Sequence, residues 1–398
     1  MYDVIVIGAG PSGMMASIIA SSNNKVLLIE KNDRVGKKLE LTGGGRCNLT
    51  NLKQIDNFIK EIPVNSKMLY SCLYQFGPQD IYDYFNKLGV PLKIENDDRV
   101  FPVSNKSKTI IESLSNQLII NNVTIQLNET VKKIDIKDNY KEVITNKDIY
   151  KTKNIVIATG GCSYSSTGST GDGYKFAKVI NQDVTNLYPA ETFLICKNSL
   201  PLAGITLDDV VVSINKKHAT GSILFTHIGL SGPAIFKISE EVYKELVNKE
   251  YVTISIDLIP NYTIDQLLEQ LNKKPNDNTR NFIKGFLPKR LTDYIITILD
   301  YNQTINTISL IKRLELIKTL KNFKIDIKST GSIEQSFVTG GGIDIRNINT
   351  KTMESKVNKG IYFTGEVLDF HGHTGGYNIT IALSTGYAAG KDIYERTK

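Results

Sequence analysis

The chain has 398 residues, of which 41% are hydrophobic and 22% are charged. The length predicts two or three domains, and the composition is that of a globular protein, which excludes extensive disorder, collagen and coiled coil. The 48 Lys and Arg against 41 Asp and Glu leave a formal charge of +7, which is compatible with an anionic cofactor but insufficient to indicate nucleic acid as a partner.

The sequence also indicates a compartment. No stretch reaches the roughly 18 uninterrupted apolar residues of a membrane span. The first residues lack the basic region and cleavage site of a secretion signal. The four cysteines are Cys47, Cys72, Cys162 and Cys196. They lie far apart without a CxxC pair, which is typical of a reducing compartment and not of a disulfide framework or a zinc site. We therefore expect a cytoplasmic protein without a metal.

The N-terminal segment predicts a strand, a tight turn, a helix and a second strand. The strands are expected at Tyr2–Ile7 and Lys25–Ile29, the turn at Gly8–Gly13 and the helix at Met14–Ser21. A strand–helix–strand unit of about thirty residues implies parallel pairing with a right-handed crossover. Two later apolar runs, Asn154–Ala158 and Gly360–Thr364, are each followed by glycine and predict further strands covered on both faces.

The middle of the chain has a different pattern. Between about residues 192 and 260, β-branched runs such as Val210–Ile214, Ser222–Thr226 and Tyr251–Ile256 alternate with turn residues, which predicts an antiparallel sheet or small barrel. From about residue 263 to residue 324, apolar residues recur at helical steps. Because a final strand and helix follow, we expect the middle to be an insertion, with the C-terminal segment packed against the N-terminal one.

The helical region carries a local excess of positive charge. From Ile264 to Lys328, twelve Lys and Arg stand against seven Asp and Glu. Two interpretations stay open: a solvated helical surface, or a basic face for an anionic partner.

The first motif, Gly8-Ala9-Gly10-Pro11-Ser12-Gly13, lies between the first strand and the helix. Gly8 permits the tight turn, Gly10 lets the backbone approach a pyrophosphate, and Gly13 allows the helix to lie close to the strand. The helix N-terminus offers N–H groups to phosphates. Glu30 closes the second strand, seventeen residues after Gly13, where a carboxylate accepts hydrogen bonds from a ribose. The motif thus predicts FAD or NAD in preference to NADP.

Two further motifs favour a flavin. After Lys37-Lys38, the loop Leu41–Asn48 (LTGGGRCN) is rich in glycine and donors, so we expect it to lie along an extended ligand, with Arg46 near a phosphate or the flavin. The segment Thr364-Gly365-Glu366 ends a strand and places an acid where it can hold a ribityl chain. The helix opening near Gly376–Asn378 would direct its positive end at the flavin ring.

The chain at this point resembles a known family. The motifs GAGPSG, IEK, GKKL, TGGGRCNLTN, IATGG, STGDGYKFA, LFTHIGLSGPAI, VTGGGI, TMESK and GEVLDFHGHTGGYNI occur in this order over nearly the whole chain. They resemble the aminoacetone-oxidase-like family of bacterial FAD-binding flavoproteins, often described as NAD(P)/FAD-dependent oxidoreductases. The resemblance implies an α/β fold: a Rossmann-like, two-part FAD-binding domain with an inserted β-barrel-like domain and a small helical domain. The expected limits are residues 1–190 and 336–398 for the FAD-binding domain, residues 191–262 and 325–335 for the inserted β-rich domain, and residues 263–324 for the helical domain.

The resemblance also implies the cofactor contacts. They are Ser12, Gly13, Glu30, Lys31, Gly44, Gly45, Arg46, Val131, Thr159, Gly160, Glu366, Tyr377, Asn378 and Ile379, with Val131 in a strand whose backbone meets the adenine. The motifs complete the expected FAD site with Gly8, Gly10, Lys37, Thr42, Gly43, Cys47, Ala158, Gly365 and Gly376. One departure from the family pattern is Phe370-His371-Gly372-His373, where such proteins commonly carry an acidic or small residue.

The catalytic candidates are few. His371 and His373 lie between Glu366 and the last helix, where an imidazole can serve as acid or base. Tyr377 is a third candidate, and exposed loop positions or core packing are the alternatives for all three. His227 follows an expected strand of the inserted domain, where it either makes a turn or faces the substrate.

The reaction itself stays open between three hypotheses. The leading one is oxidation of a small amine of the α-amino ketone type, with dioxygen as acceptor. The second is an NAD(P)H-dependent reductase of an enone-like substrate, although no second complete GxGxxG motif is present for the nicotinamide. The third is an RNA-associated flavoprotein, which rests on the basic helical region. It is the least favoured of the three, so the sequence does not lead us to expect nucleic acid as a partner. We expect no membrane partner.

Overall fold

The computed structural model describes residues 1–398, and they form two compact units. Unit 1 comprises residues 1–188 and 337–398, and unit 2 comprises residues 189–336. Strand β10 (Tyr188–Ala190) lies where the chain passes from unit 1 to unit 2. Each unit has its own hydrophobic core, and we describe each by itself.

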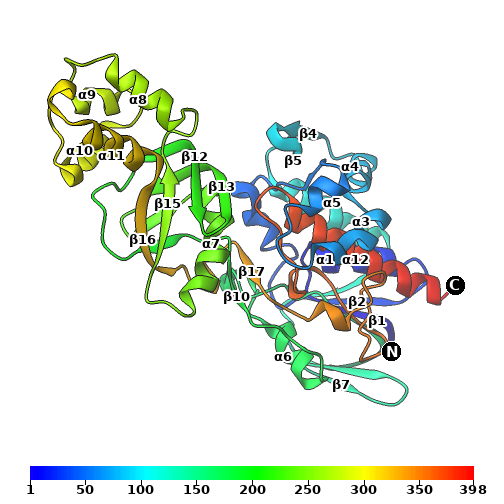
Figure 1. Cartoon of the computed structure of the whole chain (residues 1–398). Helices are drawn as coiled ribbons and strands as arrows, with labels where there is room; N and C mark the ends of the chain where they lie inside the picture. The colour runs from blue at the N-terminus through cyan, green and yellow to red at the C-terminus, as the bar shows by residue number, and fades with distance from the viewer. The chain divides into compact units, whose positions relative to one another are not determined.

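Unit 1 is built on a seven-stranded mixed sheet in the order β6-β2-β1-β9-β8-β7, with β18 also paired to β9 (Figure 1). The strands are β1 (Tyr2–Ile7), β2 (Val26–Ile29), β6 (Thr124–Gln126), β7 (Val131–Ile136), β8 (Lys141–Thr145), β9 (Ile149–Ile157) and β18 (Ile361–Phe363). β1 pairs in parallel with β2 and β9, and β18 pairs in parallel with β9. The parallel core predicted from the apolar runs is therefore confirmed, and β7 and β8 extend it as an antiparallel edge.

Two helices from opposite ends of the chain pack together over this sheet. They are α1 (Pro11–Ala20) and α12 (Tyr377–Arg396), which lie side by side in Figure 1. Two glycines of α12 allow the close approach, because a Cβ at Gly386 would lie 2.3 Å from the Ser12 carbonyl oxygen and one at Gly390 would lie 2.7 Å from that of Ala16. The expected packing of the C-terminal segment on the N-terminal one is thus present, and small residues permit it.

The rest of unit 1 surrounds this core. Its other helices are α2 (Ile55–Ile59), α3 (Tyr70–Gln75), α4 (Pro78–Lys87), α5 (Ser107–Ile120) and α6 (Asp172–Val179). Its other strands are β3 (Thr50–Asn51), β4 (Leu92–Glu95), β5 (Arg99–Pro102) and β17 (Val338–Gly340). The first three form a small sheet in the order β3-β5-β4, which the sequence patterns did not indicate.

Unit 2 contains a closed antiparallel barrel in the order β11-β14-β13-β12-β15-β16. Its strands are β11 (Leu194–Cys196), β12 (Thr206–Ile214), β13 (Lys217–Phe225), β14 (Gly229–Ser231), β15 (Val252–Asp257) and β16 (Phe323–Thr330). The antiparallel arrangement predicted from the alternating β-branched runs is therefore present, in its barrel form.

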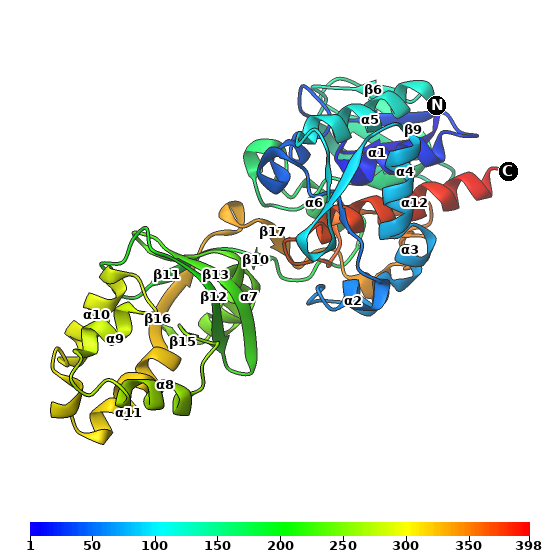
Figure 2. The same cartoon turned by 90° about the horizontal axis from the view of Figure 1, so that it is seen from above.

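Helices complete unit 2. They are α7 (Pro233–Leu246), α8 (Ile264–Asn272), α9 (Thr279–Lys284), α10 (Lys289–Leu299) and α11 (Leu310–Lys321). Helices α8 to α11 gather at one end of the barrel (Figure 2). Their apolar faces, with Leu267, Ile283, Ile295 and Leu316, belong to the same buried cluster as the barrel interior. These helices therefore share the hydrophobic core of unit 2. None of the helices in the chain combines the length and apolar character that crossing a membrane requires.

Candidate functional site

A cleft of about 460 Å³ opens in unit 1 at the carboxyl ends of the parallel strands. The residue that follows each of four strands lines it: Gly8 after β1, Glu30 after β2, Ala158 after β9 and Thr364 after β18. In open α/β sheets this edge is where ligands bind, because the turns and helix N-termini that can hold them converge there.

The glycine turn after β1 has the geometry that the sequence predicted. Gly8 has φ of +100°, and a Cβ there would lie 2.5 Å from the Ala158 carbonyl oxygen. A Cβ at Gly13 would lie 1.9 Å from the Gly8 carbonyl oxygen, so Gly13 permits the contact of α1 with β1. Gly10 differs, because no heavy atom lies within 4 Å of its Cβ position and it lines the cleft. The open space beside Gly10 suits a pyrophosphate.

Glu30 is held firmly at the end of β2. Its Oε2 accepts a hydrogen bond from the Ala9 amide at 2.8 Å, and its Oε1 accepts from the Asn32 backbone and side-chain nitrogens at 2.8 and 2.7 Å. A carboxylate offers about four lone-pair directions, so one remains for a ligand hydroxyl. Beside it, Lys31 forms an ion pair with Asp172 at 2.7 Å, and Lys37 donates to Asn32 at 3.4 Å.

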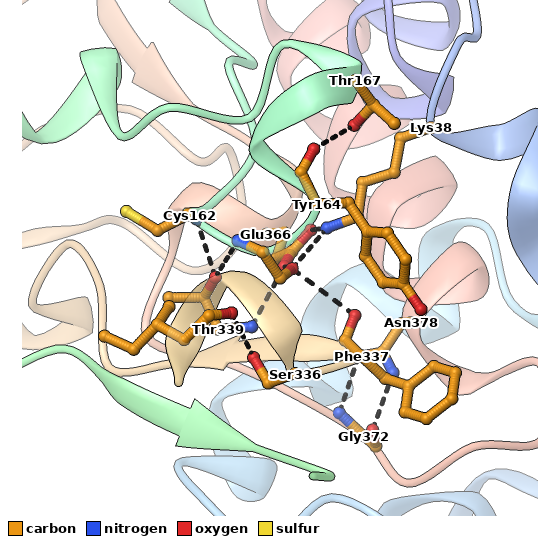
Figure 3. A network of polar contacts seen from close by, with 12 residues as sticks. Lys38, Cys162, Tyr164, Thr167, Ser336, Phe337, Thr339, Glu366, Gly372 and Asn378 are labelled. Carbon is orange, nitrogen blue, oxygen red and sulfur yellow. Dashed lines mark hydrogen bonds and ion pairs between the residues drawn. The ribbon is translucent and has the colours of Figure 1, made fainter. Parts of the chain in front are cut away.

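Glu366 is the centre of a polar network that Figure 3 shows at close range. Its Oε2 accepts from Lys38 Nζ at 2.7 Å, and its Oε1 accepts from Ser163 Oγ at 3.0 Å and from the Thr339 amide at 3.1 Å. Lys38 also donates to Ser163 Oγ at 2.7 Å. Burial acts to raise the pKa of Glu366, but Lys38 and the other donors outweigh it, so that the pKa lies below its ordinary value. The carboxylate is therefore ionised and oriented on the cleft wall.

Sequence reasoning did not include Lys38, Ser163 or Thr339 among the expected site residues. Lys38 directly follows Lys37, which was an expected cofactor residue, and both lysines line the cleft. Ser163 lies 203 positions before Glu366 and Thr339 lies 27 positions before it. No local periodicity predicts that either residue contacts Glu366, because the fold brings them together.

The loop after Leu41 lies partly on the cleft. Arg46 lines it and stacks on Phe101, with 4.1 Å from the guanidinium carbon to the ring centroid. The same guanidinium pairs with Glu95 and donates to Asn105 Oδ1 at 3.1 Å. The arginine expected to meet a phosphate or the flavin is thus engaged by an acid in this structure, and its remaining N–H groups are those available to a ligand.

The start of α12 forms another wall. Asn378 is tied to the preceding loop by two hydrogen bonds, from the Gly372 amide to its Oδ1 at 2.8 Å and from its Nδ2 to the Gly372 carbonyl at 2.7 Å. Gly376, with φ of +95°, precedes the helix and lines the cleft. The positive end of the helix therefore lies at the cleft, and its orientation towards a flavin ring stays a prediction.

Most of the expected cofactor residues meet at this one cleft. Those that line it are Gly8, Gly10, Ser12, Glu30, Lys31, Lys37, Thr42, Gly43, Arg46, Val131, Ala158, Thr159, Gly160, Gly365, Glu366, Gly376, Asn378 and Ile379. Gly13, Gly44, Gly45, Cys47 and Tyr377 do not line it. Gly13 lies between α1 and β1, and Cys47 is buried, with burial raising the pKa of its thiol to about 12. Their roles at FAD remain predictions.

The three catalytic candidates do not line the cleft. His371 is buried, with its ring 6.1 Å from that of Tyr188 in an edge-to-face arrangement. His373 donates its backbone amide to the Glu61 carbonyl at 3.0 Å. Tyr377 packs on Phe58 and its hydroxyl accepts from Lys53 Nζ at 2.9 Å. His227 lies in unit 2, after β13. A catalytic role for any of them stays a prediction.

The cleft wall carries buried polar atoms that suit a dinucleotide. The hydroxyl oxygens of Ser12, Thr159 and Thr364 are buried without a hydrogen-bond partner in the protein, and all three residues line the cleft. A buried hydroxyl without a partner costs about 1–3 kcal/mol, which a ligand oxygen or N–H group would remove. With the open Gly10 position, the N-terminus of α1 and the Glu30 carboxylate at the end of β2, these residues fit FAD.

Comparisons with known proteins identify a Rossmann domain in this chain. The family model described as HI0933-like protein Rossmann domain matches residues 2–392. The ribosomal RNA dihydrouridine synthase of Escherichia coli strain K12 is 31% identical over 404 residues, covering 98% of this chain and 98% of the relative. The 3-dehydro-bile acid delta(4,6)-reductase of Clostridium scindens is 28% identical over 412 residues, covering 100% of both chains.

Solved structures show the same fold. The 3-ketosteroid delta1-dehydrogenase from Sterolibacterium denitrificans, in complex with 1,4-androstadiene-3,17-dione, covers 99% of this chain and 99% of its own. The TM-score is 0.51 and the sequence identity is 13%. At that sequence identity, the similarity indicates a shared fold only.

Proposed function

The chain belongs to the family of HI0933-like proteins with a Rossmann domain and is an FAD-dependent oxidoreductase; from this premise we propose that it reduces a carbon–carbon double bond conjugated to a carbonyl group. We further propose that the uracil base of ribosomal RNA is its substrate.

The observation that carries the proposal is the common chemistry of two relatives that align over nearly the whole chain. The name of one describes the formation of dihydrouridine in ribosomal RNA, and that of the other describes reduction of a 3-keto bile acid with delta(4,6) unsaturation. Uracil and a 3-keto-delta-4 steroid both place a double bond next to a carbonyl group. A shared reductive step therefore accounts for both names, and the relative of higher identity, at 31%, favours the RNA base.

The reaction needs a hydride and a proton. A reduced nicotinamide would supply the hydride, so that uracil, NAD(P)H and a proton give dihydrouracil and NAD(P)⁺. FAD, held by the residues of the cleft, would supply hydride-transfer chemistry, and the protein would provide binding and orientation.

The chain's own residues divide this work along the cleft. The Gly10 turn and the start of α1 would hold the pyrophosphate, and Glu30 would accept from the ribose. Glu366 would hold the ribityl chain, kept ionised by Lys38 at 2.7 Å. The start of α12 would direct its positive end at the ring, where negative charge gathers on reduction.

The decisive experiment offers unmodified ribosomal RNA, transcribed in vitro, to the FAD-loaded protein with NADH or NADPH. We expect dihydrouridine in the digested nucleosides by mass spectrometry, and none with the apoprotein. If the flavin is bleached by NAD(P)H yet no dihydrouridine forms, while a 3-keto-delta-4 steroid is reduced, the enone chemistry stands and the RNA substrate is wrong.

A second candidate is the oxidase that the motif resemblance implies, acting on an α-amino ketone with dioxygen. Anaerobic stopped-flow absorbance separates the two. Bleaching of the flavin by aminoacetone and not by NADH or NADPH, with rapid recovery in air, would support the oxidase and refute the reductase.

A cytoplasmic location is part of the proposal, and the four unpaired cysteines support it.

A further inference from the structure

The helical segment of unit 2, residues 264–321 with α8 to α11, has an unbalanced charge. It contains ten Lys and Arg against six Asp and Glu. Figure 2 shows the four helices together at one end of the barrel, so their outer faces form one part of the surface of unit 2.

Most of the acids in this segment already have partners. Glu269 pairs with Lys273 and Asp293 with Arg280, both at 2.6 Å. Asp277 accepts from the Asn278 amide at 3.0 Å, and Glu315 accepts from the Tyr301 hydroxyl. Two of the six acids are thus ion-paired within the segment, which retains an excess of four positive charges.

Six cations of the segment are exposed and form no ion pair with an acid. They are Lys274, Lys284, Lys289, Arg290, Lys312 and Lys318. Three of them stand within seven residues: Lys284 ends α9, and Lys289 and Arg290 begin α10. Arg290 uses part of its guanidinium to bond the Ala203 carbonyl, and the rest is free for a ligand.

A second group is assembled by the fold. Arg313 at the start of α11 donates to Asn272 at the end of α8 at 2.7 Å, and the Asn306 amide donates to the Pro275 carbonyl at 2.8 Å. These bonds hold the segment just after α8, which carries Lys274, beside the start of α11, which carries Lys312. Cations from three chain segments thus face solvent on the same group of helices.

We propose that this helical segment binds the phosphate backbone of RNA, an inference that rests on the proposed function. Exposed lysines without acidic partners bind phosphates by releasing counterions and do not read base sequence. An enzyme that acts on a single base of a large RNA needs such a surface, because most of the binding free energy comes from phosphate contacts.

The test compares two charge-reversal variants of the FAD-loaded protein. The first carries Lys284→Glu, Lys289→Glu and Arg290→Glu. The control carries Lys67→Glu, Lys87→Glu and Lys132→Glu, three exposed lysines of unit 1 without ion pairs. Both variants lower the net charge equally, so a difference between them reports the position of the charges and not their sum.

Affinity for labelled, in vitro transcribed ribosomal RNA is measured by fluorescence anisotropy over a series of salt concentrations. We expect Kd of the first variant to rise on the order of tenfold or more, and the slope of log K against log salt to fall by about 2, since each lost phosphate contact removes about 0.7. The control should stay within about twofold of the unmodified protein. Equal Kd values for both variants, or binding that does not depend on salt, would overturn the proposal.

Two readouts keep the test independent of folding and of the proposed function. FAD content and thermal unfolding report whether the first variant folds, and if it does not, the neutral set Lys284→Gln, Lys289→Gln and Arg290→Gln replaces it. If the unmodified protein forms dihydrouridine and the first variant retains full RNA affinity, the surface is wrong. If the first variant loses RNA affinity but the unmodified protein forms no dihydrouridine, the substrate is wrong and the surface stands.

Discussion

The substitution Gly13→Ala should separate α1 from the strand it covers. An added Cβ would lie 1.9 Å from the Gly8 carbonyl oxygen, 3.1 Å from the Gly8 carbonyl carbon and 3.2 Å from the Ala158 Cβ. Two of these three neighbours are backbone atoms of the tight turn, so no side-chain rotation can relieve the contact. The helix must move by an ångström or more, and it also packs on α12.

The size of the effect follows from overpacking. Adding a methyl group to a fully packed site costs about 1–3 kcal/mol, and rigid backbone neighbours place Gly13→Ala at the upper end. Since about 1 kcal/mol lowers Tm by roughly 2–4 °C in a domain of this size, we expect the Tm of the apoprotein to fall by about 6–12 °C.

Gly10→Ala is the matched control with the opposite pattern. Gly10 has φ of −75° and ψ of 179°, which any residue adopts, and its Cβ would meet no heavy atom within 4 Å. The apoprotein should therefore keep its stability. Because Gly10 lines the cleft where the backbone must approach a pyrophosphate, the methyl group should weaken FAD binding by about tenfold or more, equivalent to about 1.4 kcal/mol.

Both variants are measured in the same two assays: thermal unfolding of the apoprotein, and titration of FAD followed by its fluorescence. The reasoning is refuted if Gly10→Ala binds FAD as tightly as the unmodified protein. It is equally refuted if Gly13→Ala leaves the Tm unchanged, since the backbone contacts at Gly8 would then not constrain α1.

Two other predictions concern titrating groups. Burial raises the pKa of the thiols of Cys47 and Cys72 to about 12, so neither should react with a disulfide reagent at pH 8 until the protein unfolds; peptide mapping that finds either labelled in the native protein would contradict this. The pKa of Glu366 is lowered in the folded protein, so its contribution to stability is present above the ordinary pKa of 4.5 and lost as the pH falls towards the lower folded value. Between pH 5 and 3 the free energy of unfolding should therefore decrease more steeply for the unmodified protein than for Glu366→Gln, as urea unfolding would show, whereas parallel curves would exclude this origin.

The sequence was most informative where one local pattern carries the whole constraint. Tyr2–Ile7 is β1 to the residue, and the roles of Gly8, Gly10 and Gly13 follow from the requirements of a tight turn against a strand. The alternating β-branched runs likewise predicted strands of the barrel, because their periodicity reports burial of one face.

The sequence was least informative where distant segments meet. The ion pair of Lys38 with Glu366 joins residues 328 positions apart, and no periodicity encodes it. His371 illustrates the same limit in reverse. Its loop position suggested an accessible imidazole, but the fold covers it, and only 1% of its surface is exposed. The small sheet of β3, β4 and β5 was also missed, because its strands are only two to four residues long and short runs carry no clear period.

The order in which the chain is synthesised has a consequence for this protein. Unit 2 is continuous, so it can fold as soon as residue 336 has left the ribosome, whereas unit 1 can fold completely only after residues 337–398 have been made. Until then β9 lacks its partner β18, and the apolar face of α1 lacks α12. Thr364, Glu366 and Gly376 of the cleft also arrive last. A nascent chain stalled before residue 360 should therefore present a complete barrel and an incomplete sheet, in which the part of β9 that pairs with β18 and the uncovered face of α1 are open to chaperones and proteases.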